Sequence, residues 1–339
     1  PRRVNQLWVN DGQGGWTEEA AERGLVFFEQ SWTADFGDID NDGDMDLAVT
    51  NHSTTLFLLE NDGTGHYSDI TEGSGMEVSG FFLQSKFEDF DNDGLVDFIT
   101  SGDGSSNYYF KGNGDGTFES LPWPFAYDDP MLSFATGDFG RDGQMDLIAS
   151  HGGVYVSPDN NHPDQLYVND GNDNNWVCFD LQGIESNADA VGAQVAIYGA
   201  WGVQLRDVRA GESYGITCTT HPHFGLGTAD MIDSAVVQFP SGFTTTLIGP
   251  EINTYHNVVE APCQIGAFDV TLTGNSVICP GETVTLDAPT GYTSYAWSNG
   301  DMALNIEVGE TGNYTVLVYD EDGCAGISNP VSIEVYQPE

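Results

Sequence analysis

The sequence predicts an all-β protein made of partial β-propeller blades, a small β-domain and a C-terminal immunoglobulin-like β-sandwich. The chain holds 42 glycines and 14 prolines in 339 residues, which favours many turns over long helices. Asp-rich loops and hairpin turns recur in the first half at intervals of about fifty residues, the size of one four-stranded propeller blade. Strands of alternating apolar and polar residues come after them in the second half.

Three Asp-rich loops in the first half share one pattern of nine places. They are Asp38-Ile-Asp40-Asn-Asp42-Gly43-Asp44-Met-Asp46, Asp89-Phe-Asp91-Asn-Asp93-Gly94-Leu95-Val-Asp97 and Asp138-Phe-Gly140-Arg-Asp142-Gly143-Gln144-Met-Asp146. A second pattern recurs out of phase, as Leu7-Trp-Val-Asn10-Asp-Gly, Phe57-Leu-Leu-Glu-Asn61-Asp-Gly, Tyr109-Phe-Lys-Gly-Asn113-Gly-Asp-Gly and Leu166-Tyr-Val-Asn169-Asp-Gly. Asn-Asp-Gly between apolar runs is a strong hairpin signal. Each repeat is therefore predicted to contain an Asp-rich loop, a strand and a hairpin.

The spacing of the acidic residues indicates a calcium site in each loop. Carboxylates at the first, third, fifth and ninth places would surround a hard cation, and Gly at the sixth place permits the tight bend. The seventh-place residues share no side-chain chemistry, so a backbone carbonyl is the expected ligand there. The candidate ligands are Asp38, Asp40, Asp42, Asp44 and Asp46, then Asp89, Asp91, Asp93, Leu95 and Asp97, then Asp138, Asp142, Gln144 and Asp146.

The second and eighth places of the loops are apolar and should point into the core. They are Ile39 and Met45, Phe90 and Val96, and Phe139 and Met145. The third loop is the weakest metal candidate, because Gly140 replaces an acidic ligand and Arg141 adds a positive charge beside it.

Two other interpretations of the loops fit less well. An EF-hand would need a Glu at the twelfth place between two helices. Val49, Thr100 and Ala149 stand there instead, and strands are predicted to come next. Asp-Asn-Asp-Gly strings also occur as plain solvated turns, but three copies in one register favour metal binding.

These loops resemble the FG-GAP, or VCBS-type, repeats of integrin alpha-chain propellers and many secreted bacterial proteins. The resemblance covers residues 4–175 and predicts a propeller-type domain over 1–175. It implies calcium binding through the four shared Asp places of the first two loops and through Asp138, Asp142 and Asp146 of the third. Such propellers usually close with about seven blades, whereas this chain has three loops and four hairpins. We therefore expect either a piece of a longer protein or an open sheet edge that another copy completes.

Residues 176–261 resemble an ASPIC and UnbV domain, which follows such repeats in relatives of cartilage acidic protein. The motifs are Gly183-Ile-Glu-Ser186-Asn187 with Val191-Gly192-Ala193, Arg209-Ala-Gly-Glu-Ser-Tyr214, His223-Phe-Gly-Leu-Gly227 and Phe239-Pro-Ser-Gly242. The resemblance implies a small β-domain packed on the propeller, and it implies no established chemistry.

Residues 262–339 resemble the Ig-like or PKD-like modules of secreted bacterial proteins. Strands are expected at 283–286, 294–297 and 314–319. Trp297 stands between two cysteines, as in an immunoglobulin-like fold.

The five cysteines all lie in the second half and form no CxxC pair, so a cysteine zinc site is not indicated. Disulfides in a secreted protein are the simplest explanation. We predict a Cys279–Cys324 bond first and a Cys178–Cys218 bond second, which leaves Cys263 unpaired, although sequence alone does not fix connectivity.

The charge balance limits the range of partners. The chain has 8 Lys and Arg against 53 Asp and Glu, a net charge of −45. Nucleic acid and anionic membrane surfaces attract basic proteins, so neither is an expected partner. The sequence has no apolar run of eighteen residues, so no membrane span is predicted. So acidic a surface repels itself unless cations neutralise part of it, which makes calcium the first partner expected.

The sequence contains no catalytic motif of the GxSxG, HExxH or Walker type, and we predict no enzyme activity. His221 and His223 are predicted to be structural, because they lie in a strand-and-turn motif. Four aromatic residues in turn-rich stretches are candidates for stacking on sugars, although packing is the more common role. They are Trp123, Tyr127, Trp201 and Tyr292.

The function expected is that of a secreted, calcium-stabilised structural or adhesion protein of a bacterial cell surface or matrix. Self-association into an extracellular filament is the expected assembly, with an extracellular protein or glycan as the other expected partner. The alternative is a glycan-binding or accessory portion of a larger secreted enzyme.

Overall fold

The computed structural model describes residues 4–103, 106–125, 131–152, 161–211, 213, 215–261 and 263–336. All regular structure in these ranges is β, which confirms the predicted fold class. No helix in the described ranges is long and apolar enough to span a membrane. The chain forms two compact units, the first from residues 1–178, 194–235 and 249–254 and the second from 179–193, 236–248 and 255–339. The three predicted domain boundaries stay a prediction.

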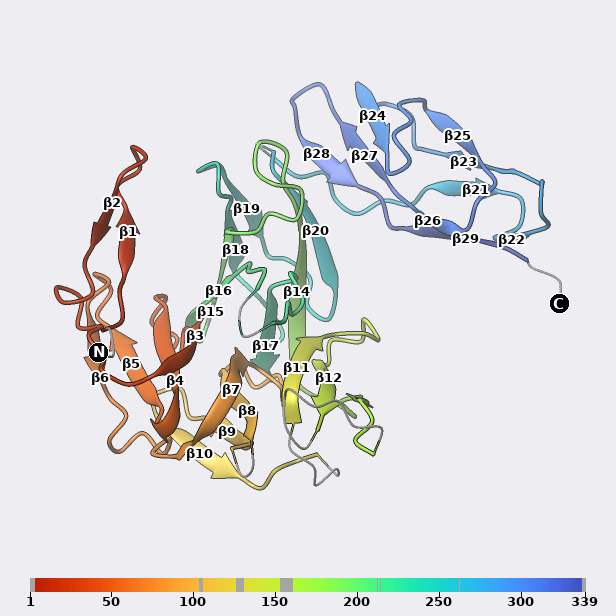
Figure 1. Cartoon of the computed structure of the whole chain (residues 1–339). Coiled ribbons are helices and arrows are strands. Elements are labelled where there is room, and N and C mark those ends of the chain that lie inside the picture. Colours follow the sequence, from red (N-terminus) through yellow and green to blue (C-terminus); the bar gives the residue numbers. More distant parts are fainter. Residues whose placement is uncertain are drawn as a thin grey trace. The chain divides into compact units, whose positions relative to one another are not determined.

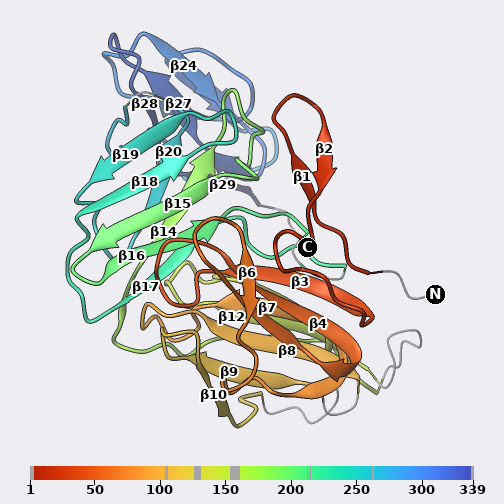
Figure 2. The same ribbon diagram turned by 90° about the vertical axis from the view of Figure 1, so that its left-hand side faces the viewer.

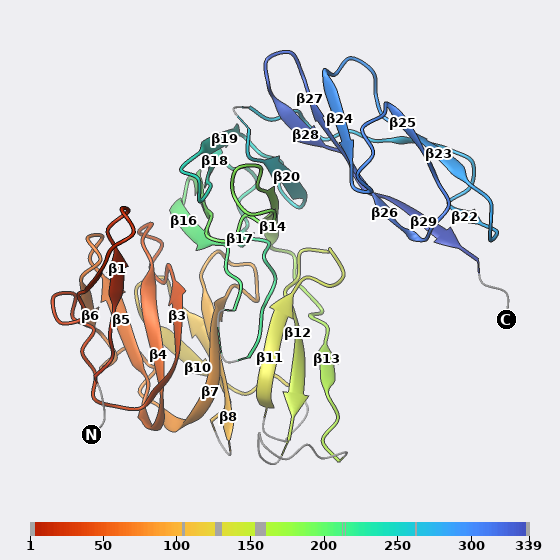
Figure 3. The same ribbon diagram turned by 45° about the horizontal axis from the view of Figure 1, so that its top comes forward.

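The first unit contains the repeat strands, coloured red to yellow-green in Figure 1. They are β1 (Trp8–Asn10), β2 (Trp16–Glu18), β3 (Ser31–Gly37), β4 (Asp46–Thr55), β5 (Phe57–Asn61), β6 (Tyr67–Asp69), β7 (Ser79–Glu88), β8 (Asp97–Asp103), β9 (Tyr108–Gly112), β10 (Phe118–Leu121), β11 (Met131–Gly137), β12 (Asp146–His151) and β13 (Gln165–Tyr167). Figure 3 shows three groups of strands in succession along the chain, β3–β6, β7–β10 and β11–β13.

Each Asp-rich loop is the turn of a hairpin between the first two strands of a repeat. The residue before the loop pairs in every case with the ninth-place aspartate that begins the next strand. The pairs are Gly37 with Asp46, Glu88 with Asp97, and Gly137 with Asp146. The loop pattern is therefore a hairpin turn, closed by antiparallel pairing on both sides.

The first two repeats join into one sheet of eight strands, seen side by side in Figure 2. β4 pairs with β7 across the repeat boundary, and the later hairpins β5–β6 and β9–β10 extend the sheet on either side. The third repeat has three strands, in the order β11-β12-β13. β1 and β2 form a separate two-stranded sheet.

The core of the repeats confirms part of the predicted apolar pattern. Ile39 and Val96 are buried in one cluster with Phe87 and Phe98. Phe90 packs against a cluster that includes Phe134 and Leu147 of the third repeat. Phe139 is 57% exposed, so its prediction as a core residue was wrong. Ile39 and Phe90 each pack in a cluster that includes residues of the next repeat, whereas no further repeat strands follow the third repeat in the described part of the chain.

Four strands after the repeats also contribute to the first unit, green in Figure 1. They are β14 (Asn175–Gln182), β15 (Gln194–Gly199), β16 (Gly202–Asp207) and β17 (His223–Gly227). Residues 175–178 of β14 pair antiparallel with β17, and β15 pairs with β16 along its whole length. β18 (Ser234–Gln238) comes next and divides between the two units.

The second unit contains the remaining strands, drawn mainly in blue in Figure 1. They are β19 (Thr244–Ile248), β20 (Tyr255–Val259), β21 (Thr271–Thr273), β22 (Val277–Ile278), β23 (Val284–Asp287), β24 (Ser294–Trp297), β25 (Asn305–Val308), β26 (Gly312–Tyr314), β27 (Val316–Tyr319), β28 (Ala325–Ile327) and β29 (Val331–Val335). Three sheets, β21-β23-β25, β22-β29-β26 and β24-β27-β28, share one core that includes Trp297 and Leu286. The immunoglobulin-like assignment stays a prediction.

The disulfide prediction was wrong. Cys324 bonds to Cys263, and Cys279 is exposed. The backbone of 263–265 runs beside Ala325, whose N–H donates to the Cys263 carbonyl at 3.0 Å, so Cys263 is brought next to Cys324. The second predicted bond is not formed either, since Cys178 and Cys218 are buried thiols.

Glu260, just after β20, fixes a loop of the second unit. It is 7% exposed, and one carboxylate oxygen accepts the N–H groups of Ile184, Glu185 and Ser186 at 2.7–2.8 Å. Its other oxygen accepts the hydroxyls of Ser186 and Ser241. Burial raises the pKa of Glu260, but the hydrogen bonds from Ser186, Ser241 and Ile184 outweigh this and lower it to about 2.

Glu260→Gln should destabilise the protein at neutral pH and remove one part of its acid sensitivity. Because the folded-state pKa lies below the ordinary value, the stabilisation is complete above about pH 4.5 and is lost as pH falls toward 2. We expect a loss of about 2–3 kcal/mol at pH 7, shrinking at pH 2.5. Urea unfolding at both pH values measures this, with the exposed Glu334→Gln as control. An equal loss at both pH values would contradict the assignment.

Candidate metal centre

The first-place aspartate of each loop closes the turn. It accepts the backbone N–H of the sixth-place glycine in all three copies. The pairs are Asp38 with Gly43 at 3.4 Å, Asp89 with Gly94 at 2.9 Å, and Asp138 with Gly143 at 2.7 Å. One carboxylate thus satisfies backbone donors that the tight turn would otherwise leave unpaired.

The ninth-place aspartate joins the loop to the later hairpin of its repeat. One oxygen accepts the second-place N–H, and the other accepts an N–H from the third strand or just beyond it. The second set of pairs is Asp46 with Asn61 at 2.8 Å, Asp97 with Gly112 at 3.1 Å, and Asp146 with Asn169 at 2.8 Å. These bonds explain why the loop and hairpin patterns recur together but out of phase.

The fourth and sixth places have left-handed backbone. The φ angles at the fourth place are 57° at Asn41, 56° at Asn92 and 52° at Arg141, and those at the glycines are 92°, 93° and 82°. Asn tolerates this region better than most residues, and glycine adopts it freely. The Asn-Asp-Gly strings therefore have a backbone role in addition to their carboxylate.

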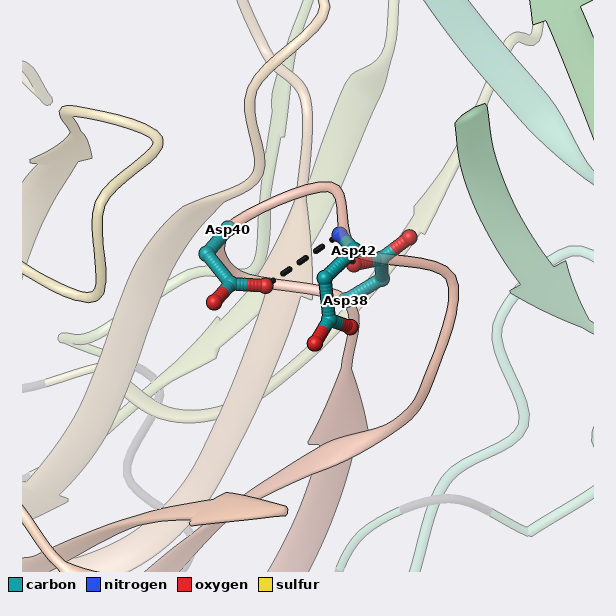
Figure 4. A group of neighbouring side chains, drawn as sticks. All are labelled: Asp38, Asp40 and Asp42. Carbon is teal, nitrogen blue, oxygen red and sulfur yellow. Dashed lines mark hydrogen bonds between the residues drawn. The ribbon is translucent and has the colours of Figure 1, made fainter. Parts of the chain in front are cut away.

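The first two loops each bring three carboxylates together. Ligand oxygens of Asp38, Asp40 and Asp42 lie within 4.8 Å of one another, and Figure 4 shows these three side chains grouped at the loop. Asp89, Asp91 and Asp93 form the matching cluster of the second loop. The third loop forms no such cluster in the part of the chain that is described, because Gly140 supplies no carboxylate.

The remaining predicted ligands lie around these clusters. Asp46 and Asp97 are buried, and each has both oxygens in hydrogen bonds with protein groups. At the seventh place, the N–H groups of Asp44, Leu95 and Gln144 donate to the fifth-place carboxylates. The Asp142 side chain is exposed, and Asp146 is buried.

The clustered carboxylates are costly to ionise without a cation. Burial raises the pKa of Asp38 to about 6 and that of Asp46 to about 7. Burial and then the Asp97 charge raise the pKa of Asp89 well above its ordinary value. One oxygen of Asp89, Oδ1, is buried without a hydrogen-bond partner among the described residues. A divalent cation supplies what these groups lack, so the residues fit calcium.

Sequence reasoning missed two residues of the second loop's site. The Lys111 ammonium contacts the carboxylates of Asp91 and Asp93, the second at 2.6 Å. The Tyr109 hydroxyl donates to Asp97 at 2.8 Å. Both lie on β9, directly before the hairpin turn, where the sequence pattern predicts a strand but does not indicate which side chains face the loop.

Segments after the repeats also reach the loops. The N–H of Leu205 in β16 donates to Asp38 Oδ2 at 3.0 Å. Gly225 in β17 lies so close to the second loop that an added Cβ would be 2.1 Å from Asp89 Oδ2. His223 is buried, and its Nε2 bonds to Asn92 Oδ1 at 2.7 Å. Burial, followed by Arg206, lowers the pKa of His223 to about 4, so it is neutral at pH 7 and acts here in packing.

The fourth-place asparagines link successive loops. Asn41 Nδ2 donates to the Gly94 carbonyl at 3.0 Å, and Asn92 Nδ2 donates to the Gly143 carbonyl at 2.8 Å. Arg141 replaces Asn in the third loop.

Replacing each of these asparagines by glycine should show how much each link contributes to the free energy of unfolding. Glycine keeps the left-handed backbone, so only side-chain hydrogen bonds are lost. Asn92→Gly should cost about 2–4 kcal/mol, because it leaves the buried His223 and the Gly143 carbonyl without their partner. Asn41→Gly, which breaks one partly exposed bond, should cost about 0.5–1.5 kcal/mol. Urea unfolding of both variants measures the difference, and equal losses would contradict this account.

Comparisons with known proteins match parts of this chain to two families. Residues 2–49 and 89–149 match the FG-GAP-like repeat family, and residues 183–265 match the ASPIC and UnbV family. Cartilage acidic protein 1 of Xenopus tropicalis is 29% identical over 74% of this chain and 40% of its own length. The Homo sapiens protein of that name is 30% identical over 70% of this chain and 37% of its own length. The chain thus spans about two fifths of these relatives.

Solved structures add nothing to this assignment. A biofilm-associated protein BSP domain aligns with 98% of this chain and 46% of its own length, at 11% identity and a TM-score of 0.15. So low a score carries no argument. The family matches confirm the first two resemblances found in the sequence, and the immunoglobulin-like one stays a prediction. This chain has FG-GAP-like repeats and an ASPIC and UnbV domain, and it is similar in sequence to cartilage acidic protein 1.

Proposed function

We propose that this chain is a secreted, calcium-binding structural or adhesion protein whose bound ions rigidify the repeats. The observation that carries the proposal is the convergence of three carboxylates within 4.8 Å in each of the first two loops. Acidic clusters alone are common on surfaces, but here Asp38 and Asp89 are fully buried. A buried carboxylate requires a counter-charge or a proton, and a calcium ion supplies the former.

Calcium would act on the fold through the loop hairpins. Each loop is the turn between two strands and is hydrogen-bonded to the later hairpin through its ninth-place aspartate. An ion held by the first, third and fifth places would fix the turn, and the strands on both sides would be fixed with it. The matched families are structural-type domains, and we propose no catalytic role for the chain.

We also propose that the chain self-associates outside the cell. β13 pairs with β12 and with no other strand of the described residues, which leaves an open edge. Ile148, Leu166 and Val168 expose apolar side chains on this hairpin. A strand from a second copy would satisfy such an edge, and a head-to-tail contact of this kind propagates as a filament.

A glycan-binding role is the alternative, and one cavity favours it. It measures about 580 Å³ and is lined by the rings of Phe90, Tyr109, Phe125 and Tyr167, with Asn169 at its polar edge. A lining of apolar and aromatic side chains with a few polar groups is typical of small-molecule sites. The aromatic residues singled out in the sequence do not share it. Trp123 and Tyr292 pack against core clusters, Trp201 lies just after β15, and Tyr127 lies outside the described residues.

Calcium should raise the melting temperature strongly. A ligand that binds only the folded state at one hundred times its dissociation constant stabilises it by about 2.7 kcal/mol per site. Each kcal/mol corresponds to about 1–2 °C in a protein of 339 residues. Differential scanning calorimetry with calcium and with chelator measures the shift. Asp40→Asn should reduce it, whereas the exposed Asp189→Asn should not. An unchanged melting temperature in chelator would sink the calcium proposal.

Self-association should require calcium or salt. Subunits with a net charge of −45 repel one another, and each Ca²⁺ offsets about two charges while salt screens the rest. Light scattering should show growth in millimolar calcium and monomers in chelator at low salt. Leu166→Lys, at the β13 edge, should abolish growth. A chain that stays monomeric at high concentration in calcium would overturn this part of the proposal.

A further inference from the structure

The two complete loops differ at one neighbouring position. In each repeat this position directly precedes the residue whose N–H donates to the ninth-place aspartate. Because those donors are Asn61, Gly112 and Asn169, the preceding residues are structurally equivalent. They are Glu60 in the first repeat, Lys111 in the second and Val168 in the third. The first loop therefore gains a negative charge where the second gains a positive one.

Lys111 lies at the carboxylates that would hold the ion. Its Nζ contacts Asp91 and bonds to Asp93 Oδ2 at 2.6 Å, so it reaches the third and fifth places of the loop. A lysine ammonium held between two carboxylates is a positive charge inside the cluster. The whole sequence has 8 Lys and Arg against 53 Asp and Glu, so a lysine is an uncommon residue to find beside an acidic loop.

The second loop nevertheless keeps a feature of a metal site. Asp89 is fully buried, belongs to the same carboxylate cluster, and has its Oδ1 without a hydrogen-bond partner in the described residues. Lys111 bonds instead to Asp91 and Asp93. The lysine thus neutralises the outer part of the cluster and leaves the buried oxygen for another cation.

Glu60 has the opposite effect on the first loop. Its side chain is exposed at the end of β5. The next residue, Asn61, donates its N–H to Asp46 at 2.8 Å, so Glu60 lies beside the first loop at the position from which Lys111 reaches the second. An added negative charge beside a calcium site strengthens cation binding, since affinity follows ligand charge.

We propose that Glu60 and Lys111 give the two loops unequal calcium affinities, the first loop tight and the second loop weak. The inference rests on the proposed calcium function and assigns its affinity order. In the second loop the Lys111 ammonium competes with calcium for Asp91 and Asp93. At low calcium the ammonium stabilises the empty loop, and at high calcium the ion displaces it. The second loop is then the part of the protein that responds to a rise in extracellular calcium.

The test is isothermal titration calorimetry of the full chain with calcium, supported by melting curves. The wild type should show two classes of site. Lys111→Met should tighten the weak class by about tenfold or more, Lys111→Arg should leave it weak, and Glu60→Lys should weaken the tight class by a similar factor. Glu72→Lys, an equal charge change at an exposed turn outside the loops, is the control and should move neither class.

Melting curves give an independent reading. In chelator Lys111→Met should melt below the wild type, because three carboxylates then lack a counter-charge, and in millimolar calcium the order should reverse. Repeating the titration in an Asp42→Asn background, which removes a first-loop ligand, identifies the remaining sites. Two sites of equal calcium affinity that neither Lys111→Met nor Glu60→Lys changes would overturn this inference and leave the proposed calcium function standing. No calcium binding by the wild type would overturn the proposed function itself.

Discussion

The repeats depend on aspartates that are buried while they accept backbone hydrogen bonds. In every loop the first-place carboxylate closes the turn and the ninth-place carboxylate joins it to the later hairpin. These side chains replace backbone partners at the points where the strands end, so the hairpins need them. The cost is desolvation, since Asp38, Asp46, Asp89 and Asp97 are at most 1% exposed. Much of the surrounding structure can be understood as compensation for that buried negative charge.

Protein cations provide part of the compensation. Arg209 bonds to the fully buried Asp35 at 2.9 Å and also to the Phe36 carbonyl. Arg206 lowers the pKa of Asp38, although burial raises it more, and it acts in the same direction on Asp89. Both arginines come from the ASPIC and UnbV part of the sequence, and Lys111 comes from the repeats. In so acidic a chain, the two arginines act on buried carboxylates of the repeats, and Lys111 pairs with the partly exposed Asp91 and Asp93.

The sequence predicted the loops and hairpins well, but it did not predict which distant residues contact them. The loops and hairpins were found because backbone geometry demands Asp, Asn and Gly at fixed spacing. Lys111 was missed because its role depends on which strand face meets the loop. The Cys263–Cys324 bond was missed because it depends on a backbone bridge between Gln264 and Ala325, residues distant in sequence. Patterns within one repeat can be recognised in the sequence, whereas contacts between distant segments depend on how the strands pack.

The third repeat shows how the array ends. Its loop keeps the turn geometry, with Asp138, Gly143 and Asp146 bonded as in the other copies. The next strand along the chain is β14, whose Trp176 lies against Gly143 so closely that an added Cβ would be 1.9 Å from the ring. Repeat arrays need a terminal element that covers the last exposed face, because each repeat buries its apolar side chains on its neighbour. Trp176 covers only the loop end of that face, because Phe139, Ile148 and Leu166 stay exposed. Glycine at the sixth place is therefore required here by the tryptophan as well as by the turn.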